Sequence, residues 1–423
     1  MELFIGPKFN LPLAWLSDAA YPLLLKTRNI QSIEISQTDK KMLRSLKEQR
    51  LLFFSNHPSA AEPVIAWHIA NLIGSRFHYM ATRRAFNFYL GLVGELFRSV
   101  NVFSIIPGIP DKKSMKMARS VLARPAGKLV LYPEGEPVCG ENDDLMPMMP
   151  GIVKLGLGGL EDARKQEPGA DIMVLPGFIK YVIQSPRDVI EKDLHRSVSR
   201  VERALGLRPG NRNMLRRFLQ VGRVILEQLE QEYNIQAGPE QDFEYRTGHV
   251  RHVMLDNVAT KLGVPKYDQS ADAIQKLRHL TSILELIELK YPNPQLPQIS
   301  KSEWDWADRE CVRAYDFITI KREYLVSYPT PERFYEWLAR FESLVLGAKP
   351  RALGGEGFHL PVKAVVSFAK PFALGDFQAE YNRDKTNGLH QVLDRLQSEL
   401  STLRDTAVQL TQPIVEPYDI GET

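Results

Sequence analysis

The sequence is poor in cysteine, in long apolar runs and in net charge, and each shortage argues against a class of protein. Its 423 residues include only Cys139 and Cys311, which lie far apart and lack metal-ligand spacing. This argues against a disulfide scaffold or a zinc site and favours a reducing compartment. No apolar run approaches the ~20 residues of a membrane span. The net charge is only +3, so the charge of the whole chain does not indicate binding to nucleic acid.

Motifs of several other enzyme classes are also missing. There is no Gly-x-Ser-x-Gly segment, so a serine nucleophile is unsupported. The glycine-rich stretch at 156–159 does not match a dinucleotide fingerprint. His249 and His252 lie three positions apart on an expected helix, but this pair alone is a weak metal motif. We therefore expect no metal site and no bound cofactor.

Short apolar runs alternate with helix-like segments through the first part of the chain. The expected strands are 51–54, 77–81, 100–106, 128–132 and 172–175, with another at 362–368 before an amphipathic helix at 386–409. Alternation of this kind predicts an α/β fold with a mainly parallel sheet flanked by helices. His57, Glu134 and Gly177 all follow expected strands. Parallel sheets carry their active residues at such carboxyl ends.

The pattern changes after about residue 186. Residues 187–360 lack strand alternation and are expected to form a large, mostly helical insertion before the last strand. We predict three parts: an N-terminal helical segment (1–50, with a helix at 31–50), an α/β domain (51–186 plus 361–411), and the insertion (187–360). The last dozen residues are expected to be a loose tail. Arginines between 196 and 223 form either a solvated face or a surface for anionic lipid or an acidic carrier protein.

Two apolar stretches allow two interpretations each. Residues 11–25 are rich in Leu and contain Trp15 and Tyr21, but Asp18 and two prolines make the stretch a poor signal peptide. It either packs on a core, which we favour, or enters a lipid interface. Residues 85–97 are apolar and aromatic. They are expected to form either a buried helix or a surface that faces acyl chains or a membrane.

The most informative stretch is Ser55 to Pro63, between the strand at 51–54 and a helix expected from Val64. It places His57 and Glu62 where a strand turns into a helix. Free backbone N–H groups and the positive end of a helix dipole occur at such a junction. It suits a histidine that acts as a general base and a carboxylate that orients it. By itself, the pair is no more frequent than chance allows.

Four blocks together resemble the PlsC-type glycerolipid acyltransferase family, which includes lysophosphatidic acid acyltransferases. Asn56-His57 with Glu62 is similar to the family's N-H-x-x-x-x-D block. About 75 residues later, Tyr132-Pro133-Glu134-Gly135 resembles its F-P-E-G block. Further similarity lies at 150–155, at 174–177, and in the closing strand and helix. The resemblance covers about half of the chain.

The resemblance implies transfer of a fatty acyl group from acyl-CoA or acyl-ACP, as co-substrate, to a hydroxyl of a glycerolipid acceptor. His57 and Glu62 would be catalytic. Residues Asn56, Ser59, Glu134, Gly135 and Lys112 would bind substrate, with Glu134 positioning the acceptor. Backbone N–H groups near Gly135 or the His57 turn would hold the oxyanion. We expect an enzyme of phospholipid biosynthesis that is cytoplasmic and peripherally bound to membranes, with no nucleic-acid partner.

The sequence also departs from the family pattern. Glu62 replaces the usual Asp and is one methylene longer. The arginine of the second block is absent from Ser104 to Gly108, and Pro137 replaces the arginine of the third block. Lysine does not fully replace the planar, bidentate phosphate binding of arginine. A neutral acceptor, or a phosphate held differently, remains open. So do a thioesterase or lipid hydrolase on the same fold and a non-catalytic lipid-binding relative.

Overall fold

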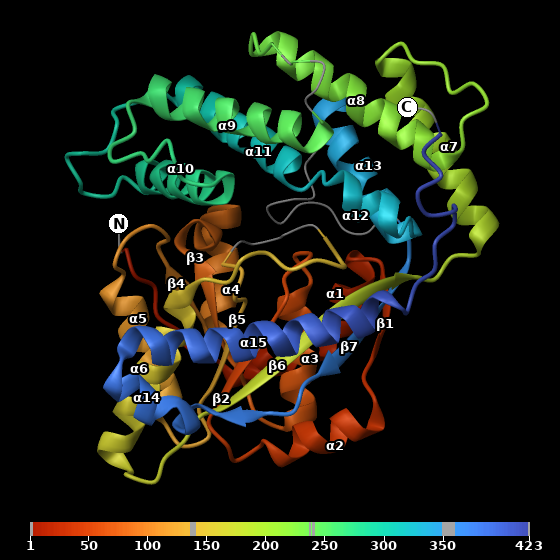
Figure 1. The fold of residues 1–423 in the computed structure, drawn as a ribbon. Coiled ribbons are helices and arrows are strands. Elements are labelled where there is room, and N and C mark those ends of the chain that lie inside the picture. The colour runs from red at the N-terminus through yellow and green to blue at the C-terminus, as the bar shows by residue number, and fades with distance from the viewer. Residues whose placement is uncertain (1–2, 136–140, 237, 239–241, 349–359, 422–423) are drawn as a thin grey trace. The chain divides into compact units, whose positions relative to one another are not determined.

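The protein is described by a computed structural model that covers residues 3–135, 141–236, 238, 242–348 and 360–421 (Figure 1). The chain divides into two compact units. The first combines Met1–Val182 with Val362–Leu410, and the second combines Ile183–Pro361 with Thr411–Thr423. The first unit contains the sheet, and the second is helical.

The first unit is built on an eight-stranded sheet with the order β1-β7-β6-β2-β5-β3-β4, and β8 pairs with β6. β2 is parallel to both β5 and β6, and β3 is parallel to β4 and β5. β8 is antiparallel to β6. The mainly parallel α/β fold predicted from the sequence is confirmed. The strands are β1 (Ile30–Glu34), β2 (Leu51–Ser55), β3 (His78–Thr82), β4 (Val102–Ile105), β5 (Lys128–Leu131), β6 (Met173–Ile183), β7 (Val362–Phe368) and β8 (Phe372–Ala373).

The two faces of β2 enter different apolar layers because side chains alternate along a strand. Leu52 and Phe54 belong to a core with α5 (Lys112–Ala123), α6 (Pro150–Gln166) and α15 (Lys385–Val408). Phe53 packs against the rings of Phe77 and Phe368 on the other side. The helices α1 (Leu11–Thr27), α2 (Gln37–Ser45) and α3 (Glu62–Ile73) lie together there. Figure 1 shows α15 running across the face of the sheet opposite α3. A strand buried on both faces explains why the run at 51–54 is uniformly apolar.

Glycines allow α6 to lie close to its neighbours. A Cβ atom on Gly159 would come 2.9 Å from Cβ of Leu122 in α5. The glycine-dense stretch at 156–159, which matches no nucleotide fingerprint, therefore has a packing role. It lowers helix propensity by about 1 kcal/mol per glycine but permits close packing.

The N-terminal segment differs from the prediction in two ways. The helix expected over 31–50 is shorter, since α2 ends at Ser45, and Ile30–Glu34 instead form the edge strand β1, parallel to β7. The sequence Ile-Gln-Ser-Ile-Glu is half polar because only one side of this edge strand is covered. α1 buries Ala14 and Leu25 but leaves Trp15 and Leu16 more than half exposed. The favoured expectation that 11–25 pack on a core is therefore wrong for most of α1.

Residues 85–97 do not form a buried helix either. They lie in a 3-10 segment, η1 (Arg83–Gly91), and a short helix, α4 (Leu92–Ser99). Near the end of η1, Tyr89 and Leu90 have positive φ angles of 50° and 56°. The side chains of Phe88, Tyr89, Leu90, Leu92 and Leu96 are exposed. In the part of the chain that is described, no helix combines the length and apolar character needed to cross a bilayer.

The second unit consists of helices around an aromatic core. Phe218 packs against Phe334 and Phe341, and Trp337 packs edge-on against Phe341. This agrees with the predicted large helical region. The helices are α7 (Arg187–Ala204), α8 (Met214–Glu232), α9 (Phe243–Leu262), α10 (Ala273–Glu288), α11 (Lys301–Ile318), α12 (Arg322–Ser327) and α13 (Pro331–Leu346).

Many of the arginines between 196 and 223 pair with acids rather than forming one open basic face. Arg217 is buried and binds both carboxylate oxygens of Glu202. Other pairs join Arg196 to Asp193, Arg200 to Glu342, Arg216 to Asp419, and Arg223 to Glu227. The Asp419 pair also corrects the expectation of a loose tail. The backbone N–H groups of Ile414 and Tyr418 bond Pro329 and Val326 of the same unit.

Candidate active site

The site lies where β2 ends and α3 begins. β2 ends at Ser55, and α3 starts at Glu62. Because β5 and β6 are parallel to β2, their carboxyl ends open at the same edge of the sheet. Glu134 follows β5 at that edge, and its carboxylate bonds the turn that carries His57. The structure thus brings together residues that the sequence separates by 77 positions.

His57 and Glu62 form a close pair. Nδ1 of His57 lies 2.6 Å from Oε2 of Glu62. The Glu62 side chain is 0% exposed, whereas His57 keeps a small exposed edge. Glu62 is the first residue of α3, where unpaired N–H groups and the helix dipole favour a carboxylate. When Nδ1 donates to this carboxylate, Nε2 is left as the acceptor that a general base requires.

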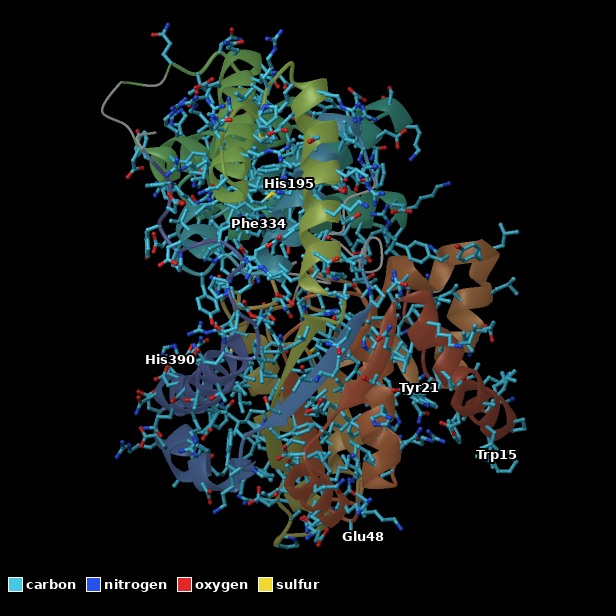
Figure 2. All side chains as sticks on the ribbon, turned by 90° about the vertical axis from the view of Figure 1, so that its right-hand side faces the viewer. Trp15, Tyr21, Glu48, His195, Phe334 and His390 are labelled. Carbon is cyan, nitrogen blue, oxygen red and sulfur yellow. The ribbon has the colours of Figure 1, made fainter. Side chains whose placement is uncertain are left out.

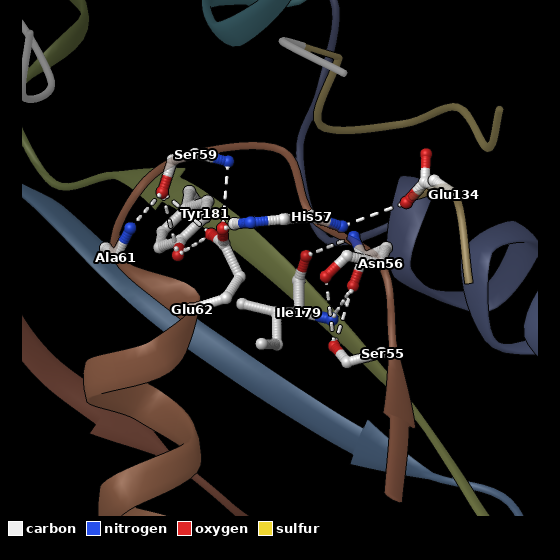
Figure 3. Close-up of polar contacts among 9 residues, drawn as sticks. All are labelled: Ser55, Asn56, His57, Ser59, Ala61, Glu62, Glu134, Ile179 and Tyr181. Atoms are coloured by element: carbon white, nitrogen blue, oxygen red, sulfur yellow. Dashed lines mark hydrogen bonds and ion pairs between the residues drawn. The ribbon is translucent and has the colours of Figure 1, made fainter. Parts of the chain in front are cut away.

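Several groups besides His57 donate to the buried carboxylate of Glu62 (Figure 3). The backbone N–H of Ser59 donates to Oε2 at 3.1 Å, and its hydroxyl donates to Oε1 at 2.7 Å. The phenol of Tyr181 also donates to Oε1. Buried carboxylates need such donors, because an unsatisfied charge in the interior is costly. Hydrogen bonds to both carboxylate oxygens therefore hold the Glu62 side chain in one orientation.

Tyr181 is a site residue that the sequence analysis missed. It lies on the extended β6, beyond the strand predicted at 172–175, and is 1% exposed. The side chain of Asn142 holds its backbone, with Nδ2 donating to O of Tyr181 at 2.7 Å and Oδ1 accepting from N at 2.8 Å. Next to it, Lys180 and Asp143 form a fully buried ion pair. Neither Tyr181 nor Asn142 is part of a local motif, so only the fold reveals their place.

Asn56, predicted to bind substrate, bonds the backbone of β6. Its Nδ2 donates to O of Ile179 at 3.0 Å, and its Oδ1 accepts from N of Ile179 at 2.8 Å. The side chain is 0% exposed. Asn56 therefore continues the β2–β6 ladder beyond the last paired residue and stabilises the start of the His57 turn. Ser59, also predicted to bind substrate, instead donates to Glu62 and accepts from the backbone N–H of Ala61.

Glu134 is occupied by backbone groups. Its Oε1 accepts from N of His57 and its Oε2 accepts from N of Met146, each at 2.9 Å. The carboxylate is buried and joins the His57 turn to the loop after β5. These contacts give Glu134 a supporting position, and its predicted role with the acceptor stays a prediction.

Two of the backbone N–H groups in the turns predicted to hold an oxyanion have hydrogen-bond partners within the protein. N of His57 donates to Glu134, and N of Gly135 donates to O of Tyr132 at 3.1 Å. Gly135 has a φ of +70°, which explains why glycine follows Glu134 in this turn. The predicted oxyanion role of the N–H groups in these two turns stays a prediction.

Tyr132 covers one face of the His57 ring. The two rings stack with centroids 4.2 Å apart. The Tyr132 hydroxyl is buried and has no hydrogen-bond partner among the described residues. Burial raises the pKa of this phenol well above its usual value, and the negative charge of Glu62 raises it further. Tyr132 thus remains a neutral donor next to the imidazole.

The loop after β4, where the family pattern has an arginine, carries no arginine side chain. Ile106, in the loop where the family pattern has an arginine, is buried, and its N–H donates to Oδ2 of Asp111 at 3.1 Å. Asp111 also caps α5. Lys112, predicted to bind substrate, is the first residue of α5 and is exposed. No hydrogen bond or ion pair joins it to His57 or Glu62 among the described residues. Pro137 lies outside the described residues.

Metal chemistry finds no support among the described residues, which contain no group of three or more metal-binding side chains. His249 and His252 lie on α9 as expected. Partial burial lowers the pKa of His252, and the nearby Lys276 and Arg251 charges lower it further. The lowered pKa favours the neutral form of this ring.

Comparison with known proteins identifies one part of the chain. Residues 31–177 match the family model described as Acyltransferase. The match includes His57, Glu62 and Glu134 and ends within β6, before Tyr181. No curated protein matches the chain at a significant level. Residues 31–177 thus have the features of an acyltransferase domain, which supports a general acyltransferase function.

Proposed function

We propose that the protein is an O-acyltransferase that moves a fatty acyl group from acyl-CoA or acyl-ACP to a hydroxyl of a lipid acceptor. The observation that carries the proposal is the His57–Glu62 pair, 2.6 Å apart at the carboxyl edge of a parallel sheet. The family match of residues 31–177 supports the reaction class. A protein that only binds lipid has no need for a buried carboxylate aligned with Nδ1 of a histidine.

In this mechanism Nε2 of His57 takes the proton of the acceptor hydroxyl as its oxygen attacks the thioester carbonyl. Glu62 keeps the proton on Nδ1 and stabilises the imidazolium that forms. When the tetrahedral intermediate collapses, the C–S bond breaks and the thiolate leaves. His57 then returns its proton to the sulfur, so the transfer needs no covalent enzyme intermediate.

The structure gives less information about the lipid acceptor than about the general base. The buried Ile106 and the exposed Lys112 offer no planar, bidentate site for a phosphate at the second block. This favours an acceptor with a neutral headgroup over 1-acylglycerol 3-phosphate. A hydrolase would use the same base with water in place of the lipid hydroxyl.

Mass spectrometry of products tests the proposal. The purified protein is incubated with isotope-labelled acyl-CoA or acyl-ACP and a total lipid extract, and with monoacylglycerol or 1-acylglycerol 3-phosphate as single acceptors. We expect label in an ester-linked lipid, with more product from the neutral acceptor. Free labelled fatty acid as the sole product would assign a thioesterase. No labelled product with either donor would contradict the function.

We also propose that the enzyme binds the membrane surface through α1, η1 and α4. The backbone of residues 8 and 10 bonds the end of α4, so these elements are neighbours. Figure 2 shows Trp15 on the outer side of this region. Its exposed apolar side chains are Phe9, Leu11, Leu13, Trp15, Leu16, Leu23, Leu24, Phe88, Tyr89, Leu90, Leu92 and Leu96. The exposed Lys8 and Lys26 suit an anionic bilayer, and Asp18 is already paired with Arg76.

Vesicle flotation tests this surface. Each large apolar side chain gains about 1.5–3 kcal/mol when it leaves water. The double variant Trp15→Ala/Leu90→Ser should therefore lose most of its binding to vesicles of phosphatidylcholine and phosphatidylglycerol. The control Leu410→Ser changes an exposed leucine outside this surface and should bind as wild type. Equal flotation of both variants would refute the assignment.

A further inference from the structure

The carboxylate at this site is one methylene longer than the aspartate of the family pattern, and the fold places a phenol at its far side. Tyr181 lies on β6, outside the matched residues 31–177 and 119 positions after Glu62. We propose that Tyr181 is a positioning residue, which fixes the longer Glu62 side chain against Nδ1 of His57 and shares its negative charge. This inference rests on the proposed role of His57.

The geometry gives Tyr181 a defined place. Its hydroxyl donates to Oε1 of Glu62, the oxygen that does not face Nδ1 of His57. The Ser59 hydroxyl, 3.2 Å from the phenol oxygen, donates to the same oxygen. Oε1 is thus occupied by two hydroxyls, and Oε2 is left for the imidazole and the Ser59 amide. This division prevents the carboxylate from rotating away from Nδ1.

The backbone of Tyr181 is as firmly held as its hydroxyl. Both its N and O atoms bond the Asn142 side chain, and the Asn56 side chain bonds the residue two positions earlier on β6. A phenol anchored in this way loses little conformational entropy when it donates. Burial raises the pKa of Tyr181 well above its usual value, and Glu62 raises it further. The phenol therefore remains a donor throughout the working pH range.

Other titratable groups face this pair from each neighbouring element. Tyr132, at the end of β5, stacks on His57, and Tyr79 of β3 acts on the Tyr132 phenol. Glu134 accepts the backbone N–H of His57. Lys180, the residue before Tyr181 on β6, is paired with Asp143 of the loop that follows β5. Of these groups, Tyr181 is the one whose side chain donates directly to the Glu62 carboxylate.

A donor to Oε1 withdraws negative charge from Oε2 and so weakens the attraction between Glu62 and a protonated His57. Removing the phenol oxygen should strengthen that attraction. In a Tyr181→Phe variant, the His57 imidazole should therefore keep its proton to higher pH than in wild type. Near neutral pH, less of it should then be present as the free base. A purely structural role for Tyr181 would lower stability but would not move this titration in a defined direction.

NMR titration of the full-length protein labelled with ¹³C in its histidine rings measures the effect directly. The His57 signal is the one that disappears in His57→Ala. In Tyr181→Phe we expect its titration midpoint to rise by about half a pH unit or more. Ser59→Ala, which removes the second hydroxyl on Oε1, should shift it in the same direction. The exposed Tyr89→Phe should leave it unchanged.

Acyl transfer measured across pH supplies the second readout. The acid limb of kcat/KM in Tyr181→Phe should move to higher pH by the same amount, and activity should approach that of wild type at alkaline pH. Identical His57 midpoints in wild type, Tyr181→Phe and Ser59→Ala would overturn the inference even if acyl transfer occurs. A shifted midpoint in a protein that forms no acyl product would overturn the proposed function and leave the positioning role standing.

Discussion

At the scale of single residues, the geometry of the site depends on the turn that carries His57. The His57 turn is held by the Asn56 side chain on one side and by the Glu134 carboxylate on the other. Both were expected to bind substrate, yet both bond the protein backbone. These contacts give both side chains a role in the geometry of the His57 turn, and their predicted contacts with substrate stay predictions.

Gly135 offers a test at this scale. In Gly135→Ala the added Cβ would meet Sδ of Met149 at 2.0 Å, which the half-exposed Met149 side chain can relieve by moving. The φ of +70° cannot be relieved, so the free energy of unfolding should fall by about 1–2 kcal/mol. Urea unfolding measures this change.

Gly151 is the matched control. It lies in the first turn of α6, and a Cβ atom there would meet nothing within 4 Å. Gly151→Ala should leave stability unchanged or raise it by up to about 1 kcal/mol, since alanine favours a helix. Equal destabilisation by both substitutions would show that the turn conformation is not the cause.

At the scale of elements, β6 connects the site to the rest of the sheet. The asparagines at 56 and 142 each bond both backbone groups of one β6 residue, Ile179 and Tyr181. Side-chain amides thus replace a missing strand neighbour. The predicted strand stopped at 175 because the apolar run is interrupted by Pro176 and Gly177, although the strand itself continues to Ile183.

Asn142→Ala should weaken this connection. The substitution leaves the N–H and C=O groups of Tyr181 without their side-chain partner in a buried place. Each unsatisfied group costs about 1–3 kcal/mol, so we expect a loss of at least about 2 kcal/mol in urea unfolding. The control Asn382→Ala removes an exposed amide on α14 (Gln378–Arg383) and should cost little. A loss no larger than that of the control would contradict the bracing role.

The elements also show what the sequence can and cannot predict. Runs of apolar residues identified the central strands because these are buried on both faces. The turn at His57 followed from the strand–helix junction. β1 escaped detection because it is a half-polar edge strand, and the segment at 85–97 was ambiguous because apolar residues fit a core and a lipid surface equally well. Tyr181 reaches the site through the pairing of β6 with β2, and Asn142 reaches it through its hydrogen bonds to Tyr181. No local sequence pattern reveals either link.

At the scale of the whole molecule, the chain forms an α/β unit that is interrupted in sequence by a helical unit. The helical unit contains Asp316, a buried carboxyl that bonds the Ser343 hydroxyl at 2.7 Å. Burial raises its pKa to about 6, while the Ser343 hydrogen bond and the charge of Arg340 act in the opposite direction. The proton is thus held more tightly in the folded state.

This carboxyl should make the helical unit sensitive to pH. Its contribution to stability is fully present below the ordinary aspartate pKa and is lost as pH rises through about 6. Asp316→Asn should therefore gain about 2–3 kcal/mol relative to wild type between pH 4 and pH 7.5. The exposed Asp268, whose pKa is lowered by hydrogen bonds from Ser270, should show the opposite sign in Asp268→Asn. A constant gap between wild type and Asp316→Asn in urea unfolding at both pH values would contradict this account.

The central claim is that His57 is the base of an acyl transfer, and its most direct test is the rate of labelled lipid formation by His57→Ala. The exposed His390→Ala on α15 serves as the matched control. Loss of a general base costs about 10²–10⁴-fold in rate. We predict a loss of that size in His57→Ala and wild-type activity in His390→Ala, with both variants folded. Full acyl transfer by His57→Ala would contradict the claim.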